Sequence, residues 1–260
     1  MSKTALITGA SSGIGEELAR LHAEKGGNLI IVARSEERLI ALKAELEKAH
    51  DINVHVIVKD LTRPKAAKEI YEQVSIEGLS VDYVINNAGF GSLGKFFDGD
   101  LDNYLSMISL NISALTALTH YFVRDMIAAK SGEILNVSST ASLLPGPLQA
   151  VYFATKAYVT SFGNALAEEL QGTGVSVTNL LPGATHTRFS EISGMDGTDM
   201  FVNAASARKV AKDGYNAMLA HKLDVISGLS PWQLLQLKMA PIVPKRLKLQ
   251  QIRKMQETKR

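Results

Sequence analysis

The sequence predicts an α/β fold in which helices cover both faces of a doubly wound parallel sheet, built as a single domain. Short apolar runs alternate with longer segments of helical length, which is the pattern of consecutive βαβ units. A glycine-rich turn separates the first apolar run from the first helical segment. A chain of 260 residues is long enough to bury a core on each face of such a sheet.

The first half of the chain supplies four predicted strands. Each is a short run rich in Val, Ile or Leu, at residues 5–8, 29–33, 54–58 and 81–86. Segments of helical length follow the first three of these runs, at residues 14–25, 35–49 and 64–74. Because each strand is followed by a helix, the strands are expected to run parallel.

The second half continues the alternation. A buried strand at 134–137 separates two long helical segments at 102–129 and 151–171, and a sixth strand is predicted at 175–180. We divide the chain into a main unit, residues 1–225, and a C-terminal extension, residues 226–260, that is first apolar and then basic.

Composition excludes several classes of function. The net charge of +2 gives no reason to expect a nucleic-acid partner, and the absence of cysteine excludes disulfides and thiolate chemistry. The histidines have no spacing that would bind zinc, so no metal site is expected. The first strand begins too early for a signal peptide, and no apolar run is long enough to span a membrane. We therefore expect a cytoplasmic protein.

Tyr152 and Lys156 form the first chemical signal. Four residues apart on a helix, they share one face. A nearby cation lowers the pKa of an acid by roughly 1 to 3, so Lys156 is expected to lower that of the phenol from ~10 toward neutrality. The strand at 134–137 runs into Ser138 and Ser139, where a hydroxyl could hold a carbonyl oxygen beside the phenol. An ordinary surface pair on an amphipathic helix would have the same spacing.

The glycine turn is the second signal. Gly9, Gly13 and Gly15 lie between a strand and a helix, where missing side chains let the helix N-terminus approach a pyrophosphate. A purely structural turn is the alternative. The spacing differs from the commoner dinucleotide fingerprint, whose first two glycines are closer together.

Taken together, these motifs and Asn86-Asn87-Ala88-Gly89 occur in one order along the chain. In that order and spacing, the chain from about Thr4 to about Ala220 resembles the classical short-chain dehydrogenase/reductase family. The resemblance implies a Rossmann fold and hydride transfer between a nicotinamide cofactor and a carbonyl or secondary alcohol. It selects Ser139 over Ser138, makes Tyr152 the general acid and base, and completes a catalytic tetrad with Lys156 and Asn111.

The resemblance also assigns a nucleotide site. Its residues are Gly9, Ser11, Ser12, Gly13, Ile14, Gly15, Arg34, Asp60, Leu61, Asn87, Ala88, Gly89, Tyr152, Lys156, Pro182, Gly183, Thr185 and Thr187. Asp60 would bond the adenine amino group, although an aspartate here could equally cap the next segment. Thr187 would bond the nicotinamide carboxamide.

Cofactor choice depends on the end of the second strand. An enzyme that reads the 2′-hydroxyl of NAD usually has an acid there, whereas the 2′-phosphate of NADP needs a cation. This chain has Ala33-Arg34, which favours NADP(H) over NAD(H). The alternative is an exposed Arg34 paired with Glu36, Glu37 or another neighbour.

Asn111 lies in the middle of a predicted helix among apolar residues. A buried amide should be hydrogen-bonded. The resemblance implies that Asn111 holds a water that links Lys156 to solvent, whereas an asparagine in a helix often only kinks it.

Substrate identity is only weakly encoded. The segments at 143–148 and 189–201 are largely apolar, with Ile192, Met195 and Met200 in the second, and they favour an uncharged, hydrophobic ketone or aldehyde. Family resemblance implies a homodimer or homotetramer. Small residues of the Tyr152 helix, Gly163 among them, would permit close helix packing between subunits.

The C-terminal extension is strongly basic. Residues 238–260 hold eight Lys and Arg against Glu257, so this segment carries +7. One reading is a peripheral anchor on an anionic membrane. We favour an extension packed over the substrate pocket or a subunit neighbour, with a solvated basic end.

Three functional interpretations follow. The leading one is an NADPH-dependent carbonyl reductase, or in reverse an alcohol dehydrogenase. The second is a catalytically silent dinucleotide-binding sensor or scaffold, against which the intact tetrad argues. The third is a membrane-associated reductase that modifies lipids.

Overall fold

The computed structural model describes residues 2–194, 204–239 and 243–257, without the side chains of Ile192 and Lys238. Met195, Met200 and the basic residues Lys259 and Arg260 lie outside these ranges. No helix in the described ranges combines the length and the apolar character that a membrane crossing requires.

Within the described ranges, seven parallel strands form one sheet and confirm the predicted fold class. They are β1 (Thr4–Thr8), β2 (Asn28–Ala33), β3 (Val54–Val58), β4 (Tyr83–Asn86), β5 (Gly132–Val137), β6 (Val175–Pro182) and β9 (Asp224–Ser227). The strand order is β3-β2-β1-β4-β5-β6-β9, so the chain winds outward in both directions from the β1/β4 pair. The carboxyl ends of β1 and β4, where the order reverses, are where such folds place a ligand.

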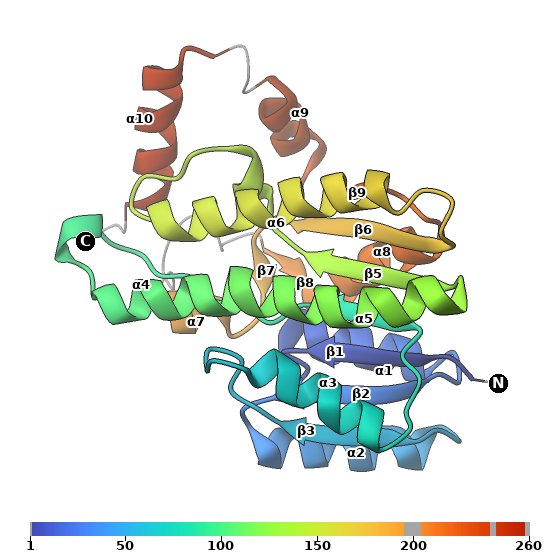
Figure 1. Ribbon diagram of the computed structural model, residues 1–260. Coiled ribbons are helices and arrows are strands. Elements are labelled where there is room, and N and C mark those ends of the chain that lie inside the picture. Colours follow the sequence, from blue (N-terminus) through green and yellow to red (C-terminus); the bar gives the residue numbers. More distant parts are fainter. Residues whose placement is uncertain (1, 195–203, 240–242, 258–260) are drawn as a thin grey trace.

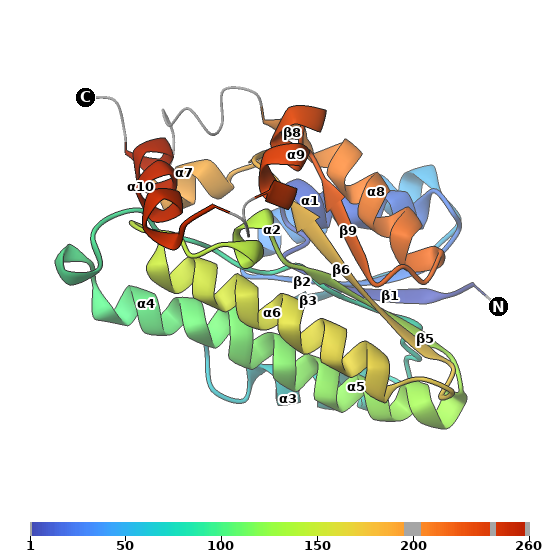
Figure 2. The ribbon, with the colours of Figure 1, turned by 90° about the horizontal axis from the view of Figure 1, so that it is seen from above.

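Helices cover both faces of the sheet (Figure 1). One layer contains α1 (Gly13–Ala23), α2 (Glu36–Ala49) and α8 (Ala207–Leu219), and the other contains α3 (Ala66–Ile76), α5 (Leu115–Ala129) and α6 (Ala150–Glu169). Seen from above, the sheet separates these layers (Figure 2). Alternate residues of β1 face opposite cores: Ala5 and Ile7 pack under α1, and Leu6 packs toward α3.

Several details differ from the sequence prediction. The helix expected at 102–129 consists of α4 (Leu101–Ile108), a π-helical turn η2 (Ser109–Ala114) and α5. The short strand β9 and the helix α8 were not predicted, and the boundary proposed at residue 225 falls inside β9. With only Val225 and Ile226 apolar, β9 is too short to show a pattern. Helix α3 begins later than predicted because Lys65 has a left-handed backbone, φ 67°.

A row of buried amides crosses the sheet. Asn86, Asn136 and Asn179 are register partners on β4, β5 and β6, and the side-chain Nδ2 of Asn86 donates to Asn136 Oδ1 at 3.0 Å. A Cβ on Gly163 would collide with Asn179 Oδ1. Gly163 therefore faces the sheet, and the prediction that it packs against another subunit is wrong.

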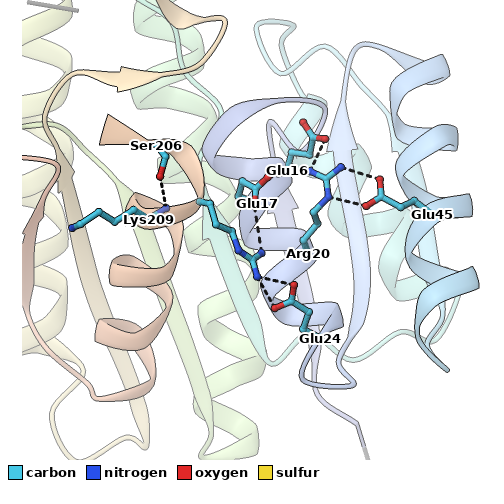
Figure 3. A network of polar contacts seen from close by, with 8 residues as sticks. Glu16, Glu17, Arg20, Glu24, Glu45, Ser206 and Lys209 are labelled. Carbon is cyan, nitrogen blue, oxygen red and sulfur yellow. Dashed lines mark hydrogen bonds and ion pairs between the residues drawn. The ribbon is translucent and has the colours of Figure 1, made fainter. Parts of the chain in front are cut away.

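Ion pairs join α1 to both neighbouring helices (Figure 3). Arg20 of α1 forms a two-pronged pair with Glu45 of α2, at 2.8 and 2.9 Å, and also contacts Glu16. Arg208 of α8 pairs with Glu17 and Glu24 of α1. Bidentate, networked pairs fix geometry better than isolated surface pairs do, so this network holds α1 in place behind the glycine turn.

His22, also on α1, makes fold stability depend on pH. Its Nε2 donates to the Lys3 carbonyl oxygen at 3.0 Å, which leaves Nδ1 to accept from the Tyr215 hydroxyl at 2.8 Å. Burial lowers the pKa of His22. Below the ordinary histidine value of ~6.5, the unfolded chain binds a proton that the folded chain resists.

We therefore expect the free energy of unfolding to fall as the pH drops through ~6.5, by at most about 1.4 kcal/mol per pH unit from this group. Urea unfolding of the wild type and of His22→Gln, at pH values on either side, measures the difference in slope. The same substitution at the exposed His120 is the control. Parallel slopes for wild type and His22→Gln would contradict the assignment.

Candidate active site

A cavity of about 1530 Å³ opens at the carboxyl ends of the strands. It is lined by the glycine turn, the ends of β2 and β4, the segment after β5, the start of α6 and the loop after β6. All the residues predicted for the catalytic and nucleotide sites line it except Gly15 and Asn111. The structure thus gathers into one place residues that are far apart in the sequence.

The glycine turn has the backbone that a phosphate cradle needs. Gly9 and Gly13 have left-handed backbones, with φ of 67° and 61°. Helix α1 begins at Gly13, and the Ser12 side chain does not cap it. The first amide N–H groups of α1 are consequently directed toward the cavity end of the helix, where an anion is stabilised.

Gly15 has a structural function. A Cβ at this position would collide with the Asn87 side chain and the Gly9 carbonyl oxygen. Its absence lets α1 approach Asn87, whose Nδ2 donates to the carbonyl oxygens of Thr8 at 2.9 Å and Gly9 at 3.2 Å. The Thr8 hydroxyl in turn accepts from the backbone N–H groups of Asn87 and Ala88, both at 3.0 Å. These bonds tie the end of β4 to the end of β1.

Arg34 lies exposed on the cavity wall, directly after β2. Among the residues that the structure describes, it forms no ion pair with Glu36 or Glu37, so the predicted alternative pairing is not seen. Burial raises the pKa of Asp60, but hydrogen bonds from Thr62 and the charges of Arg34 and Arg63 outweigh it and lower the pKa overall. Asp60 Oδ1 accepts from the backbone N–H and the hydroxyl of Thr62, at 3.0 and 2.7 Å. It therefore closes a local turn while still lining the cavity, and it does not cap α3, whose N-cap is Lys65.

Tyr152 lies in an apolar part of the cavity, with 8% of its surface exposed. Its ring packs against Phe153 and Phe189, the latter at 5.3 Å between centroids. Burial raises the pKa of Tyr152 to about 12, and a hydrogen bond with Ser139 offsets this only in part. The phenol is therefore protonated near neutral pH, as a proton donor must be.

Lys156 does not act on the phenol as predicted. Its Nζ donates to the Val137 carbonyl oxygen at 2.8 Å and lies 6.0 Å from the centre of the Tyr152 ring. Burial lowers the pKa of Lys156 to about 8. The expectation that the ammonium lowers the phenol pKa is wrong for this arrangement, because desolvation dominates both groups.

The two serines after β5 have different surroundings. The Ser138 hydroxyl donates to the Lys156 carbonyl oxygen at 3.0 Å and lies 2.7 Å from the Thr160 hydroxyl, so it fastens β5 to α6. Ser139 Oγ accepts from the Ala141 N–H at 3.1 Å and reaches the Pro182 carbonyl oxygen at only 3.5 Å. Ser139 is thus the serine with hydrogen-bonding capacity left for a ligand.

Asn111 lies in the π-helical turn with 1% of its surface exposed. Its amide pairs with the backbone of Phe90, accepting at 3.1 Å and donating at 3.0 Å, and also donates to the Thr155 hydroxyl. Both N–H groups of the side chain are thus used within the protein, and its oxygen accepts one bond. π-Helical turns such as η2 are frequent at functional sites.

The loop after β6 closes over the glycine turn. A Cβ on Gly13 would lie 2.8 Å from Thr187 Cγ2, so Thr187 packs directly against the turn. The Thr185 hydroxyl donates to the Gly183 carbonyl oxygen at 2.9 Å, which stiffens the loop. His186 is exposed.

The sequence favours a C-terminal extension packed over the pocket, but the prediction named none of the residues by which this extension lines the cavity. Helices α9 (Pro231–Met239) and α10 (Lys245–Gln256) line it from the far side with Gln233, Gln236, Leu237, Met239, Lys248, Gln251, Ile252, Lys254, Met255 and Gln256. In both views α10 lies beside the N-terminal end of α6 (Figure 1, Figure 2). The signal was available in the spacing of residues 248, 251, 252, 255 and 256, which form one helix face.

Comparison with known proteins agrees with this geometry. Residues 3–196 match the family described as short chain dehydrogenase. A short chain dehydrogenase of Pseudocercospora fijiensis is 37% identical over 206 residues, 78% of this chain and 64% of that protein. Sulfoacetaldehyde reductase 2 of Chromohalobacter salexigens is 38% identical over 192 residues, 73% of this chain and 75% of that protein.

A solved structure, a short-chain dehydrogenase from Sphingobium yanoikuyae in complex with NADPH, superposes with a TM-score of 0.82 at 30% identity. The superposition covers 92% of this chain and 94% of that one. The matched family, the relatives and the sheet topology point to one assignment. The chain belongs to the short-chain dehydrogenase family of oxidoreductases.

Proposed function

We propose that the protein is an NADP(H)-dependent reductase of ketones or aldehydes, or in reverse an alcohol dehydrogenase, with Tyr152 as general acid and base. One observation carries the proposal. A single cavity of about 1530 Å³ contains both the glycine turn and the group formed by Ser139, Tyr152 and Lys156. A nucleotide bound on the turn would therefore face the phenol across one continuous space.

The residues present fit a dinucleotide phosphate. The uncapped start of α1 and the left-handed Gly9 and Gly13 suit a pyrophosphate, and Arg34 suits a 2′-phosphate because it occupies the position directly after β2 where an NAD enzyme usually has an acid. The relative from Sphingobium was solved with NADPH, which supports the same choice. When bound, the cofactor would supply a hydride to the carbonyl carbon in reduction, or accept one from the alcohol carbon in oxidation.

Side chains of the protein stabilise the negative charge on the substrate oxygen and supply its proton. Tyr152 donates its proton to the oxygen as negative charge develops there, and Ser139 steadies that oxygen through its hydroxyl. The apolar surroundings of Tyr152 exclude water, which strengthens both interactions. Lys156, charged at neutral pH because its pKa is about 8, replaces the lost proton and positions the nucleotide sugar.

Asn111 serves as a positioning residue. By holding Phe90 through two hydrogen bonds, it fixes the segment that follows Gly89 along the cavity. A Cβ on Gly89 would lie 3.1 Å from Asn111 Oδ1 and 3.4 Å from Lys156 Nζ, so the glycine leaves room for both side chains beside this segment. The proposed proton path to solvent runs from Lys156 past this turn.

The other interpretations are less well supported. A silent binding module has no use for a buried Tyr152 beside Ser139, and α10 presents a face to the cavity, which favours a pocket cover over a membrane anchor. A homodimer or homotetramer in the cytoplasm remains our expectation from the family.

Calorimetric titration with NADPH and separately with NADH, followed by an assay of NADPH oxidation with aliphatic aldehydes and ketones, tests the function. We expect tight NADPH binding, much weaker NADH binding, and carbonyl-dependent oxidation. If NADPH bound tightly but no carbonyl compound were reduced, the reductase proposal would fail and the silent dinucleotide-binding protein would be the better interpretation.

A further inference from the structure

Gln256 is the last residue of α10 and has 1% of its surface exposed, yet it lines the cavity. Neither its Nε2 nor its Oε1 has a hydrogen-bond partner in the described ranges. Leaving a buried amide unpaired costs about 1 to 3 kcal/mol, so native proteins rarely do it without a reason. A polar group of a ligand would satisfy this amide.

Gln256 belongs to a continuous face of α10. Lys248, Ile252 and Gln256 follow one another at intervals of four residues, and Gln251 and Met255 lie beside them; all five line the cavity. Gln250, on the opposite side of the helix, and Lys245, in its first turn, are exposed and do not line it. The helix therefore presents a mixed polar and apolar face to whatever enters the cavity.

The charged side chains that α10 contributes to the cavity wall are all positive. Lys248 and Lys254 line it from α10, and among the described residues that line the whole cavity, Asp60 is the one carboxylate and belongs to the nucleotide end. An anion entering from the α10 side meets two ammonium groups and no acid, whereas a cation would be repelled.

The carbonyl end of the same cavity is apolar. Around Tyr152 it is lined by Phe90, Leu110, Leu144, Phe153 and Phe189. A substrate that reaches from the phenol to α10 thus passes from an apolar region to a basic, amide-bearing one.

Building on the proposed reductase function, we infer that the substrate is an aldehyde or ketone with an anionic oxygen group, such as a carboxylate, at the end away from its carbonyl, and that Gln256 recognises this group. The Gln256 amide N–H donates to the anion, and Lys248 adds the attraction of a cation. This revises the uncharged substrate expected from the sequence, because that expectation took no account of α10.

Matched probes test the inference. Succinic, adipic and suberic semialdehydes are compared with their methyl esters in NADPH-dependent reduction, so that each pair differs by the negative charge and one methyl group, and chain length is scanned. We expect one of the acids to be reduced with a kcat/KM about tenfold or more above that of its ester. Gln256→Leu should lower that value about tenfold, mainly through KM, and change the ester less than about twofold.

Controls lie on the same helix. Gln250→Leu and Lys245→Met make the same chemical changes at exposed residues of α10 that do not line the cavity, and they should leave the preference for the acid unchanged, whereas Lys248→Met should reduce it. Equal losses for acid and ester in Gln256→Leu would mean that Gln256 only packs, and would overturn the inference. So would a preference for the ester.

A binding measurement distinguishes a failure of this inference from a failure of the proposed reductase function. If no aldehyde is reduced, calorimetry of the NADPH complex with adipate and with dimethyl adipate still decides the recognition of the anion. Tighter binding of adipate, lost in Gln256→Leu, would support it while the reductase proposal fails. Equal binding of the two would end it.

Discussion

Replacing Tyr152 by phenylalanine should lower kcat by about 10² to 10⁴ while leaving the affinity for NADPH nearly intact. Positioned acid catalysis contributes this much to proton transfer, and the phenol hydroxyl lies in the cavity within hydrogen-bond reach of Ser139. The ring of phenylalanine preserves the packing with Phe189. Steady-state reduction of a carbonyl probe and calorimetric titration with NADPH measure the two effects separately.

Tyr158→Phe is the matched control, because Tyr158 lies on the same helix but is partly exposed and loses only a hydrogen bond to Thr116. It should retain full activity. If Tyr152→Phe weakened NADPH binding as much as turnover, the hydroxyl would be a binding group and another acid would have to be found.

The pH dependence follows from the raised phenol pKa. Below about 12, Tyr152 stays protonated, so the reduction that uses it as an acid should not be lost between pH 6 and about 7.5. As the pH rises through about 8, Lys156 loses its charge and reprotonation of the phenol should slow. A tyrosinate difference spectrum between the wild type and Tyr152→Phe reports the ionisation of the phenol directly; ionisation near pH 7 would restore the original prediction that Lys156 acts on it.

The parts of the site that the sequence predicted are those defined by local backbone demands. Gly9 and Gly13 need left-handed backbones, and Gly15 must leave room for Asn87. The spacing of these glycines therefore follows from the shape of the turn, and the turn can be predicted from it. Likewise, a helix fixes the common face of Tyr152 and Lys156 whatever surrounds it.

What the sequence did not show depends on contacts between distant segments. The direction of the Lys156 side chain is set by the Val137 carbonyl oxygen on a neighbouring strand, and the π-helical turn by the pairing of Asn111 with Phe90. The basic run of α10 hid an inward face, because a cluster of Lys and Arg usually indicates solvent exposure on all sides. Only the folded chain shows that Gln256 is buried.

Substituting Arg34 by aspartate should invert the choice of cofactor. The guanidinium offers several donors to a 2′-phosphate, each charged hydrogen bond being worth about 1.5 to 3 kcal/mol, and an aspartate would repel the phosphate while accepting from a 2′-hydroxyl. We expect NADPH affinity to fall about a hundredfold or more and NADH affinity to stay level or rise. Because Arg34 is exposed and forms no ion pair with Glu36 or Glu37 in the described chain, the change should cost little stability.

Calorimetric titration of each variant with both nucleotides measures the ratio of affinities, and thermal unfolding checks that the fold survives. Lys43→Asp makes the same change of charge on α2, at a partly exposed lysine paired with Glu47, and should leave the ratio unchanged. If Arg34→Asp also left the ratio of NADPH to NADH affinity unchanged, a residue other than Arg34 would bind the 2′-phosphate. Other cations on the cavity wall include Lys59, held by Glu69 at 3.0 Å, and Arg188, and the same measurement on their variants would test whether either binds the phosphate.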